Sequence, residues 1–385
     1  MVTNTPSYND SDFAAAFPAS GLAGMVGLIG GRDGTRYARA FGHSNAMSGT
    51  AMAADTVFQI ASMTKAITSV AAMQLVEAGK LSLDAPIGDV VPALADAQVI
   101  SGFGEGDAPI LRPAARPITL RHLLTHTSGL GYDFVSVDQL RARQGAAPAP
   151  GTIASITTPL WFDPGERGGH GVSTGWIGLA VEAVSGQTLG AYFADHICGP
   201  LGMVDTHFHT AETMPANAAS IHVRSPAGLM AIPVNLGGGD FNSGGGGLSS
   251  TGADYMRFLR MILNNGTLDG ATILSPATVA DMTRNQIGGL PAGRMGSANP
   301  ELAPPYGPFP GMDCGWGLGF LINPVPGPNG RAAGSLAWAG IFNTYYWVDP
   351  ASDVIGIFLS QLMPFGDAGA LAAAGALERM AYAPQ

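Results

Sequence analysis

Charged residues are scarce in this sequence. Asp, Glu, Lys and Arg make up 12% of the 385 residues, and lysine occurs only twice, as Lys65 and Lys80. The net charge of −10 leaves no basic stripe that would neutralise phosphate groups. We therefore exclude nucleic acid as a partner. The neutral surface that so few charges imply leaves association into a homo-oligomer open.

Cysteine and long apolar runs are scarce as well. Cys198 and Cys314 are the two cysteines, and neither has neighbours at metal-ligand spacing. We expect both to be buried thiols rather than a disulfide framework. No apolar stretch approaches the roughly 20 residues of a membrane-spanning helix, and residues 1–10 lack the basic and apolar regions of a signal peptide. These absences predict a cytoplasmic protein that does not contact a membrane.

Apolar residues make up 46% of the chain, enough for a sizeable core. Hydrophobic periodicity predicts two strands near the N-terminus, helices through the middle, and a run of strands and a last helix at the end. Strands at both ends predict an α+β fold, in which one antiparallel sheet is flanked by helices. We expect residues 1–85 and 285–385 to form an α/β domain, residues 86–284 an inserted, mainly helical domain, and the active site to lie in the crevice between them.

Ser62 and Lys65 stand at the start of a predicted helix that ends at Gly79. Residues three apart on a helix share one face, so the amine and the hydroxyl are close enough to interact. A serine hydroxyl is a poor nucleophile until a neighbouring base takes its proton, which a desolvated lysine can do. The pair is a candidate nucleophile and base, although Ser-x-x-Lys by itself also occurs on ordinary solvated helices.

Ser173 is a second candidate nucleophile, because residues 171–175 match the Gly-x-Ser-x-Gly elbow of α/β-hydrolases. That elbow follows a buried strand. Residues 159–170 contain two prolines and three glycines and do not predict such a strand. An ordinary helix N-cap is the preferred interpretation of Ser173.

Six motifs occur in order over about residues 20–380, and together they are specific although each alone is not. They are Ser62-x-x-Lys65, His122-Leu-Leu-Thr-His-Thr-Ser-Gly129, Pro164-Gly-Glu166, Leu201-Gly-Met203, Gly246-Gly-Leu-Ser-Ser-Thr251, and Trp338-Ala-Gly340 with Trp347-Val-Asp-Pro350. In these motifs the chain resembles the serine β-lactamase-related superfamily, which includes class C β-lactamases and penicillin-binding proteins. Within it the chain is most similar to family VIII carboxylesterases.

This resemblance implies Ser62 as the acyl-accepting nucleophile and Lys65 as its proton partner. It further implies an oxyanion hole made by the backbone N–H groups of Ser62 and Ile341. The strand that carries Trp338, Ala339 and Gly340 would line the substrate site.

The sequence departs from the family at the third catalytic position. Where the family has a tyrosine, this chain has His170, followed by Gly171 and Val172. An unperturbed histidine has a pKa near 6.5 and can accept a proton at neutral pH. His170 is therefore a candidate general base, with a rate that would fall below about pH 6. Two alternatives remain open: Lys65 as the sole base, or a displaced tyrosine such as Tyr132.

Two positions favour ester over lactam substrates. β-Lactamases carry a Lys-Thr-Gly triplet that binds the drug carboxylate, whereas this chain has Trp338-Ala339-Gly340; Val172 replaces the asparagine that bonds the drug amide. Loss of these polar groups leaves an apolar site suited to small neutral esters. We expect a carboxylesterase that needs no metal or organic cofactor. An acyltransferase, a β-lactamase, a D-aminopeptidase and a non-catalytic binding relative remain alternatives.

Overall fold

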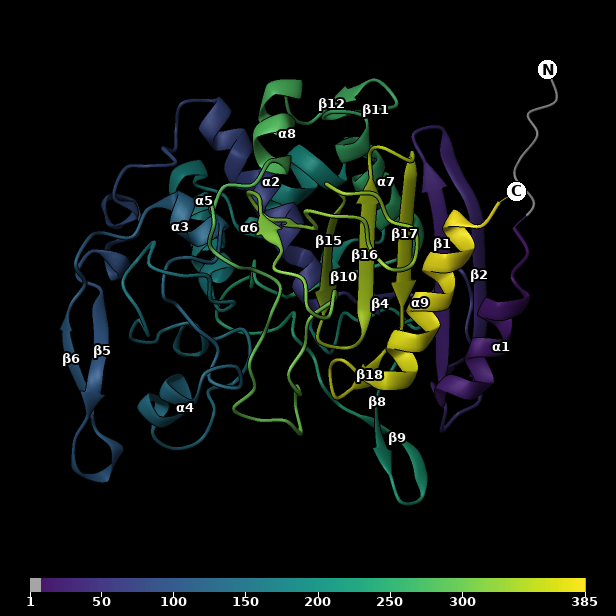
Figure 1. The fold of residues 1–385 in the computed structure, drawn as a ribbon, viewed down its shortest axis with the longest axis horizontal. Coiled ribbons are helices and arrows are strands. Elements are labelled where there is room, and N and C mark those ends of the chain that lie inside the picture. Colours follow the sequence, from purple (N-terminus) through teal and green to yellow (C-terminus); the bar gives the residue numbers. More distant parts are fainter. Residues whose placement is uncertain (1–7, 385) are drawn as a thin grey trace.

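The computed structural model describes residues 8–384. Its largest element is an antiparallel sheet of eight strands in the order β13-β14-β15-β16-β17-β1-β2-β3, seen at the right of Figure 1. The strands are β13 (Gly315–Trp316), β14 (Leu321–Ile322), β15 (Leu336–Gly340), β16 (Thr344–Asp349), β17 (Val354–Leu359), β1 (Gly24–Gly31), β2 (Gly34–Asn45) and β3 (Thr50–Ala51). The two ends of the chain meet where β1 pairs with β17, so the predicted antiparallel sheet built from both termini is confirmed.

Strand β1 is buried along its whole length because helices cover both faces of the sheet. The helices α1 (Ser11–Ser20) and α9 (Ala368–Tyr382) pack together on one face, and α7 (Gly252–Leu263) contacts β1, β16 and β17 on the other. Gly27 permits this close packing, since a Cβ there would lie 2.5 Å from the ring of Phe13 in α1. The sheet is therefore the middle of three layers.

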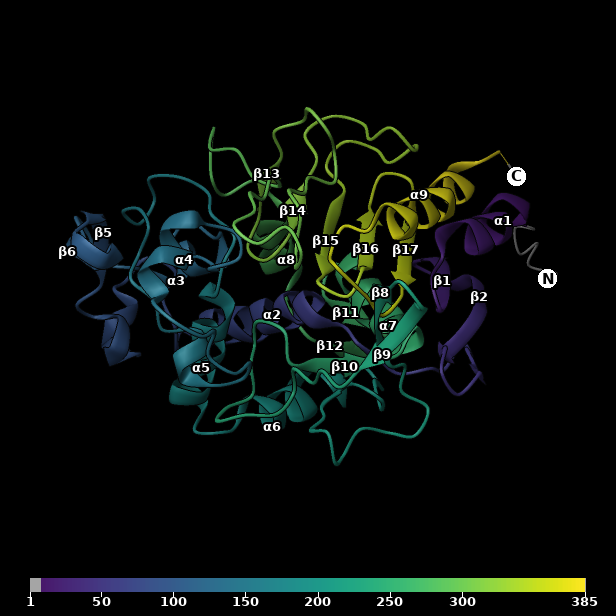
Figure 2. The same ribbon diagram turned by 90° about the horizontal axis from the view of Figure 1, so that it is seen from below.

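Helix α2 (Thr64–Glu77) connects the sheet to the helical part of the molecule. Every side chain from Thr64 to Met73 is buried, so this helix has no solvent-facing side over that stretch. Figure 2 shows α2 running from the sheet, near β15, toward α5 (Ser173–Ser185), against which it packs. The remaining helices are α3 (Leu120–Leu124), α4 (Val137–Arg143), α6 (Leu189–Phe193) and α8 (Pro276–Thr283).

The predicted division into an α/β domain (1–85 and 285–385) and an inserted helical domain (86–284) stays a prediction. Helix α7 belongs to the inserted segment in sequence, yet it packs on the sheet. Conversely, α2 precedes that segment and packs on α5 within it. The two parts therefore share helices across the predicted boundaries.

Several short strands form small separate sheets. The Pro- and Gly-rich segment that leads to Pro117, whose composition is typical of irregular loops, contains the hairpin β5 (Gln98–Phe103) and β6 (Pro109–Pro113). Its pairing crosses a bulge near Ile100, which interrupts the alternation that predicts a strand. The other small sheets are β4 (Phe58–Gln59) with β10 (Leu248–Ser250) and β7 (His207–Phe208), β8 (Ile221–Ser225) with β9 (Gly228–Ile232) and β18 (Leu362–Met363), and β11 (Thr267–Leu268) with β12 (Ala271–Thr272).

None of the helices within residues 8–384 has the length and apolar character needed to cross a membrane.

Candidate active site

Ser62 lies in a single 3₁₀ turn, Ala61–Met63, directly before α2. The preceding residue, Ala61, has a φ of 46°, a left-handed conformation that costs a residue with a Cβ about 1 kcal/mol or more. Neighbouring strands hold this turn in place: the Ile60 N–H donates to Leu248 O at 3.0 Å, and Thr344 Oγ1 donates to Ile60 O at 3.3 Å. The hydroxyl group is thus presented from a backbone that the sheet and β10 fix on both sides.

Lys65 is 2% exposed, and its amine has three oxygen partners. Nζ lies 3.1 Å from Ser62 Oγ, 3.1 Å from the hydroxyl oxygen of Tyr132 and 2.6 Å from Gly245 O. A carbonyl oxygen can only accept, so one N–H of Lys65 always points to Gly245. The other two directions of the amine face Ser62 and Tyr132. Lys65 can therefore carry a proton between these two hydroxyl groups.

Tyr132 reaches Lys65 from the loop that follows α3. The loop turns sharply at His126, with a φ of 54°, and at Gly129, with a φ of 86°. A Cβ at Gly129 would lie 2.2 Å from Phe162 O, so this close turn requires glycine. The ring of Tyr132 stacks on Phe134, with centroids 4.8 Å apart. The His-Leu-Leu-Thr-His-Thr-Ser-Gly motif thus ends in the turn that places the Tyr132 phenol next to the Lys65 amine.

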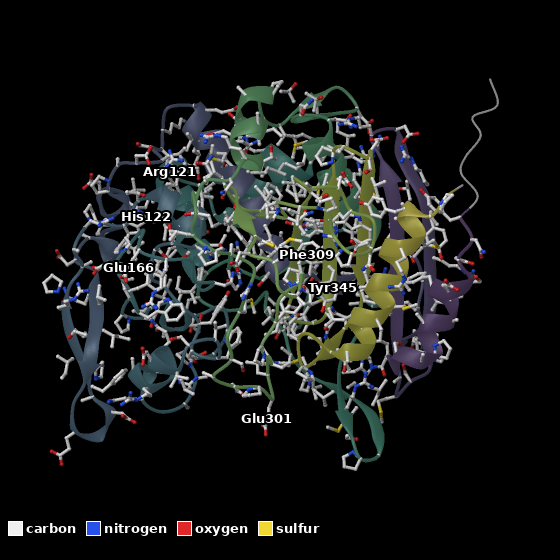
Figure 3. The ribbon with its side chains drawn as sticks, viewed as in Figure 1. Arg121, His122, Glu166, Glu301, Phe309 and Tyr345 are labelled. Carbon is white, nitrogen blue, oxygen red and sulfur yellow. The ribbon has the colours of Figure 1, made fainter. Side chains whose placement is uncertain are left out.

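Other residues of that motif stabilise α3 at a distance from the amine. His122 completes a capping box, in which its own N–H donates to Thr119 Oγ1 and the Thr119 N–H donates to His122 Nδ1, both at 3.2 Å. Figure 3 shows His122 beside Arg121 on this helix, in the part of the molecule away from the sheet residue Tyr345. His122 is a structural residue here.

The glycine-rich stretch 237–247, whose composition is typical of a flexible loop, reaches the active site. Gly245 O accepts from Lys65, and Gly244 O accepts from Thr68 Oγ1 at 2.8 Å. A Cβ on Gly244 would lie 2.9 Å from Thr68 Cγ2 and 3.0 Å from Thr174 O. The glycines therefore allow the backbone to approach α2 and α5 closely, and this end of the stretch is a fixed wall of the site.

His170 lies near these groups without bonding to them. Its ring centroid is 5.6 Å from that of Tyr132 and 4.5 Å from those of Trp338 and His126. Within residues 8–384 its nitrogens make no hydrogen bond to Ser62 or Lys65. Burial, followed by the charges of His126 and Lys65, lowers the pKa of His170 well below 6.5. At neutral pH the imidazole is uncharged.

His126 is the second imidazole of this cluster and is more deeply enclosed. Its ring packs edge-on against Trp316, with centroids 5.0 Å apart. Burial lowers the pKa of His126 to about 3, and the charge of Lys65 acts in the same direction. Sequence reasoning did not assign His126 to the site, because no spacing rule links it to Ser62.

The end of β15 lies against the nucleophile turn. A Cβ on Gly340 would lie 2.5 Å from Ile60 O and 3.2 Å from the Ala61 Cβ, so only glycine fits there. Ile341 follows directly, which places its backbone next to this turn. The geometry is compatible with the predicted oxyanion hole, which stays a prediction.

The side chains of three other predicted substrate-binding residues, Trp338, Ala339 and Val172, lie in different surroundings. Trp338 packs on His170 and, with centroids 4.6 Å apart, on Trp316. Ala339 belongs to the apolar cluster on the opposite face of the sheet, because successive residues of a strand point to opposite faces. Val172 is 5% exposed and is part of the core beside α2. Trp338 is the one of these side chains that contacts the histidine cluster.

Ser173, the second candidate nucleophile, is fully buried. Its hydroxyl lies 2.8 Å from Ser128 Oγ, and residue 172 rather than 173 is the N-cap of α5. The expected N-cap role is therefore wrong; the hydroxyl joins α5 to the loop after α3. Within residues 8–384, no group of three or more His, Cys, Asp and Glu side chains is arranged to hold a metal ion.

Comparison with known proteins identifies the family. The beta-lactamase family model matches residues 11–379. The chain belongs to the beta-lactamase family. It is an enzyme of this serine hydrolase and acyltransferase family, and its relatives include esterases and acyltransferases.

Two curated relatives illustrate this range within the family. A lovastatin esterase of Penicillium rubens is 34% identical, with 90% of this chain and 91% of the relative covered. The acyltransferase calJ of Penicillium decumbens is 31% identical, with 86% and 82% covered. The unliganded simvastatin synthase of Aspergillus terreus superposes with a TM-score of 0.83 at 27% identity, covering 97% of this chain and 96% of that one. The predicted superfamily and fold are thereby confirmed.

Proposed function

We propose that this protein is a carboxylesterase that cleaves small neutral esters through an acyl-enzyme on Ser62. The observation that carries the proposal is the position of the Lys65 amine, 3.1 Å from both Ser62 Oγ and the Tyr132 hydroxyl. An activated serine needs a base within hydrogen-bond reach and a group that orients that base. Lys65, held by Gly245 O and Tyr132, meets both conditions.

The proposed acylation moves one proton in a closed path. Ser62 Oγ attacks the ester carbonyl carbon while its proton passes to the Lys65 amine, and an oxyanion forms. As that intermediate collapses, the carbon–alkoxy bond breaks. The Tyr132 phenol gives its proton to the leaving alkoxide, and Lys65 returns a proton to Tyr132.

In deacylation, water takes the place of the alcohol. As water attacks the acyl carbon it gives a proton to the Tyr132 oxygen, while Tyr132 passes its own proton to the Lys65 amine. Lys65 then gives that proton to Ser62 Oγ when the ester bond to Oγ breaks. The backbone N–H groups of Ser62 and Ile341 are proposed to stabilise the oxyanion in both steps. No step requires a metal or an organic cofactor.

Tyr132 replaces His170 as the proposed proton donor and acceptor beside Lys65. The phenol oxygen lies within hydrogen-bond distance of Lys65 Nζ. The His170 ring instead packs against Trp338. The lowered pKa of His170 would also move any acidic limb due to this residue well below the expected pH 6. The geometry therefore favours the displaced tyrosine, which was one of the alternatives left open by the sequence.

Neutral esters are favoured over β-lactams because the polar groups that bind a lactam drug are replaced. Trp338 stands at the position of the family's lysine, and Val172 at that of its asparagine. An apolar wall loses the charge-assisted bond to a drug carboxylate but accepts an uncharged ester. We propose the esterase branch of the family on this basis.

Acyl transfer is the second candidate, since relatives at about 31% identity include acyltransferases. Hydrolysis and transfer share the acyl-enzyme and differ in whether water or an alcohol attacks it. Adding an acceptor alcohol to a running hydrolysis and measuring the transfer product separates the two. The ratio of transfer to hydrolysis at a fixed alcohol concentration is the quantity to measure.

A fluorophosphonate label followed by peptide mass spectrometry tests the proposed nucleophile. We expect the adduct on Ser62 in the wild-type protein and none in Ser62→Ala. The matched control is Ser173→Ala, which should label normally on Ser62. An adduct on Ser173 would contradict the proposal, and the absence of any adduct would favour a binding protein without turnover.

A further inference from the structure

Three buried nitrogens beside the Ser62 site have no hydrogen-bond partner within residues 8–384. They are Nδ1 of His126, Nδ1 of His170 and Nε1 of Trp338. Leaving a buried polar atom unpaired costs about 1–3 kcal/mol, so such atoms are usually paired. Their concentration in one cluster of touching rings is the observation that needs an explanation.

Two other indoles of the same core have hydrogen-bond partners. Trp316 Nε1 donates to Leu124 O at 3.0 Å, and Trp176 Nε1 donates to Ile156 O at 2.9 Å. The fold can therefore pair an indole N–H with a backbone carbonyl here. Other buried atoms within residues 8–384 are also unpaired, among them Nε1 of Trp161 and Nε1 of Trp347. What distinguishes the three nitrogens is that the rings of His126 and Trp338 both contact that of His170, beside Tyr132.

The position of Tyr132 indicates which part of a substrate lies near His170. In the proposed reaction the leaving alkoxide takes its proton from the Tyr132 hydroxyl, so the alkoxy oxygen must lie within hydrogen-bond reach of that group. The oxyanion, in the same proposal, is bound by the backbone N–H groups of Ser62 and Ile341 and not by the phenol. His170, with its ring 5.6 Å from that of Tyr132 and partly exposed, is therefore on the alcohol side of the site.

Neutral imidazole suits an alcohol. It carries one N–H donor and one bare nitrogen acceptor, so it can donate to an ester oxygen or accept from a free hydroxyl group. Burial keeps His170 uncharged at neutral pH, as its lowered pKa shows. Around it, Trp338 and Trp316 meet edge to face at 83°, and Tyr132 stacks on Phe134. Aromatic walls of this kind favour a flat apolar body.

We propose that His170 and Trp338 form the alcohol subsite of this enzyme, which recognises alcohols with a flat apolar ring next to the hydroxyl-bearing carbon. This inference rests on the proposed esterase function. The His170 imidazole and the Trp338 indole N–H bond to polar oxygen of the alcohol, and the ring of the alcohol packs on the aromatic side chains. His170 is a specificity residue in this arrangement, and Tyr132 remains the group that transfers the proton.

A series of esters with one acyl group tests the subsite. Ethyl, benzyl and 2-naphthylmethyl butyrates release alcohols of similar acidity, so their intrinsic reactivity is similar. We expect wild-type kcat/KM to rise along the series. In His170→Ala and in Trp338→Ala the preference for naphthylmethyl over ethyl ester should fall roughly tenfold, since each variant removes aromatic surface on which the alcohol ring packs. His170→Phe and Trp338→Phe keep a ring but lose a hydrogen bond to the oxygen that all three alcohols share, so their kcat/KM should fall roughly tenfold for every ester.

Two further measurements separate alcohol recognition from general base catalysis. All three esters form the same butyryl-enzyme, so its hydrolysis by water, followed by single-turnover kinetics, should change less than about threefold in His170→Phe. The matched control is Trp176→Phe, which removes an indole N–H outside the cluster. It should lower stability but leave the ratio between esters unchanged.

Two results would overturn the subsite, each in a distinct way. An equal loss for all esters, together with slow hydrolysis of the acyl-enzyme, would make His170 a proton-transfer group. An unchanged ester ratio in both alanine variants would show that the alcohol does not touch these rings. If His170→Phe does not fold, His170→Asn serves in its place. Absence of an acyl-enzyme on Ser62 in the wild type would instead contradict the proposed function itself.

Discussion

Two neighbouring polar clusters differ in how their atoms are paired. In the first, the Lys65 amine has three oxygen partners, which belong to Ser62, Tyr132 and Gly245. In the second, nitrogens of His126, His170 and Trp338 have none within residues 8–384. The first cluster is complete before any substrate arrives, as a preorganised catalytic group requires. The second has unused hydrogen-bonding capacity, which is what a site for a polar ligand group requires.

Breaking the paired cluster at Ser62 should have the largest effect. Ser62→Ala is expected to lower ester kcat/KM by roughly 10⁴-fold or more, because no acyl-enzyme can form. The control Ser173→Ala removes a buried hydroxyl and should retain activity while losing about 1 kcal/mol of unfolding free energy. Steady-state hydrolysis and denaturant melts measure both quantities. Comparable activity in the Ser62 variant would exclude this serine as the nucleophile.

Removal of the Tyr132 hydroxyl should come next. Tyr132→Phe keeps the ring stacked on Phe134 and is expected to lower kcat by about 10²- to 10⁴-fold, the usual range for a general acid–base group. The loss should be similar for every ester, in contrast to the alcohol-dependent loss predicted for His170→Ala. Equal profiles for the two variants over the ester series would remove the distinction between the clusters.

The backbone support of Ser62 can be tested at Gly340. Gly340→Ala places a Cβ 2.3 Å from Thr344 Oγ1 and 2.5 Å from Ile60 O, so β15 or the nucleophile turn must move. We expect a loss of about 1–3 kcal/mol in stability, typical of overpacking, together with reduced kcat. Gly102→Ala is the control, since a Cβ there meets nothing within 4 Å. If Gly340→Ala melts and turns over like Gly102→Ala, the close packing at β15 does not support Ser62.

The unpaired cluster should also govern acid stability. Burial lowers the pKa of His126 to about 3 in the folded protein, against an ordinary value of 6.5. The unfolded chain therefore binds a proton between these values and the folded chain does not, so stability is full above pH 6.5 and falls as the pH is lowered toward 3. Between pH 6.5 and 4.5 this one group should cost about 2–3 kcal/mol.

His126→Asn is the variant that isolates this effect, since asparagine tolerates the left-handed backbone at position 126. Its unfolding free energy should fall less between pH 6.5 and 4.5 than that of the wild type, as measured by urea titration at each pH. His196→Asn, at an exposed histidine, should follow the wild-type curve. Parallel curves for His126→Asn and the wild type would contradict the lowered pKa.

Much of the fold could be predicted from local pattern. Alternation and the Asp33-Gly34 turn predict the hairpin now seen as β1 and β2, and the apolar run before Gly79 predicts α2. Local pattern does not predict hairpin β5–β6, because its register shift and its prolines interrupt the alternation of apolar and polar residues that is typical of a strand. Local pattern fails where pairing between strands, rather than sequence spacing, decides the structure.

The sequence by itself determined which residues are near each other along one helix and which motifs are present. It predicts that Ser62 and Lys65 lie close together, because a spacing of three residues on a helix fixes that distance whatever surrounds it.

Only the tertiary structure decided which third side chain contacts the Lys65 amine. Tyr132 is 67 residues from Lys65 and reaches it through the turns at His126 and Gly129. His170, chosen from its place in a motif, is instead held against Trp338 and Tyr132 by packing. Its uncharged state follows from burial, which no local spacing specifies.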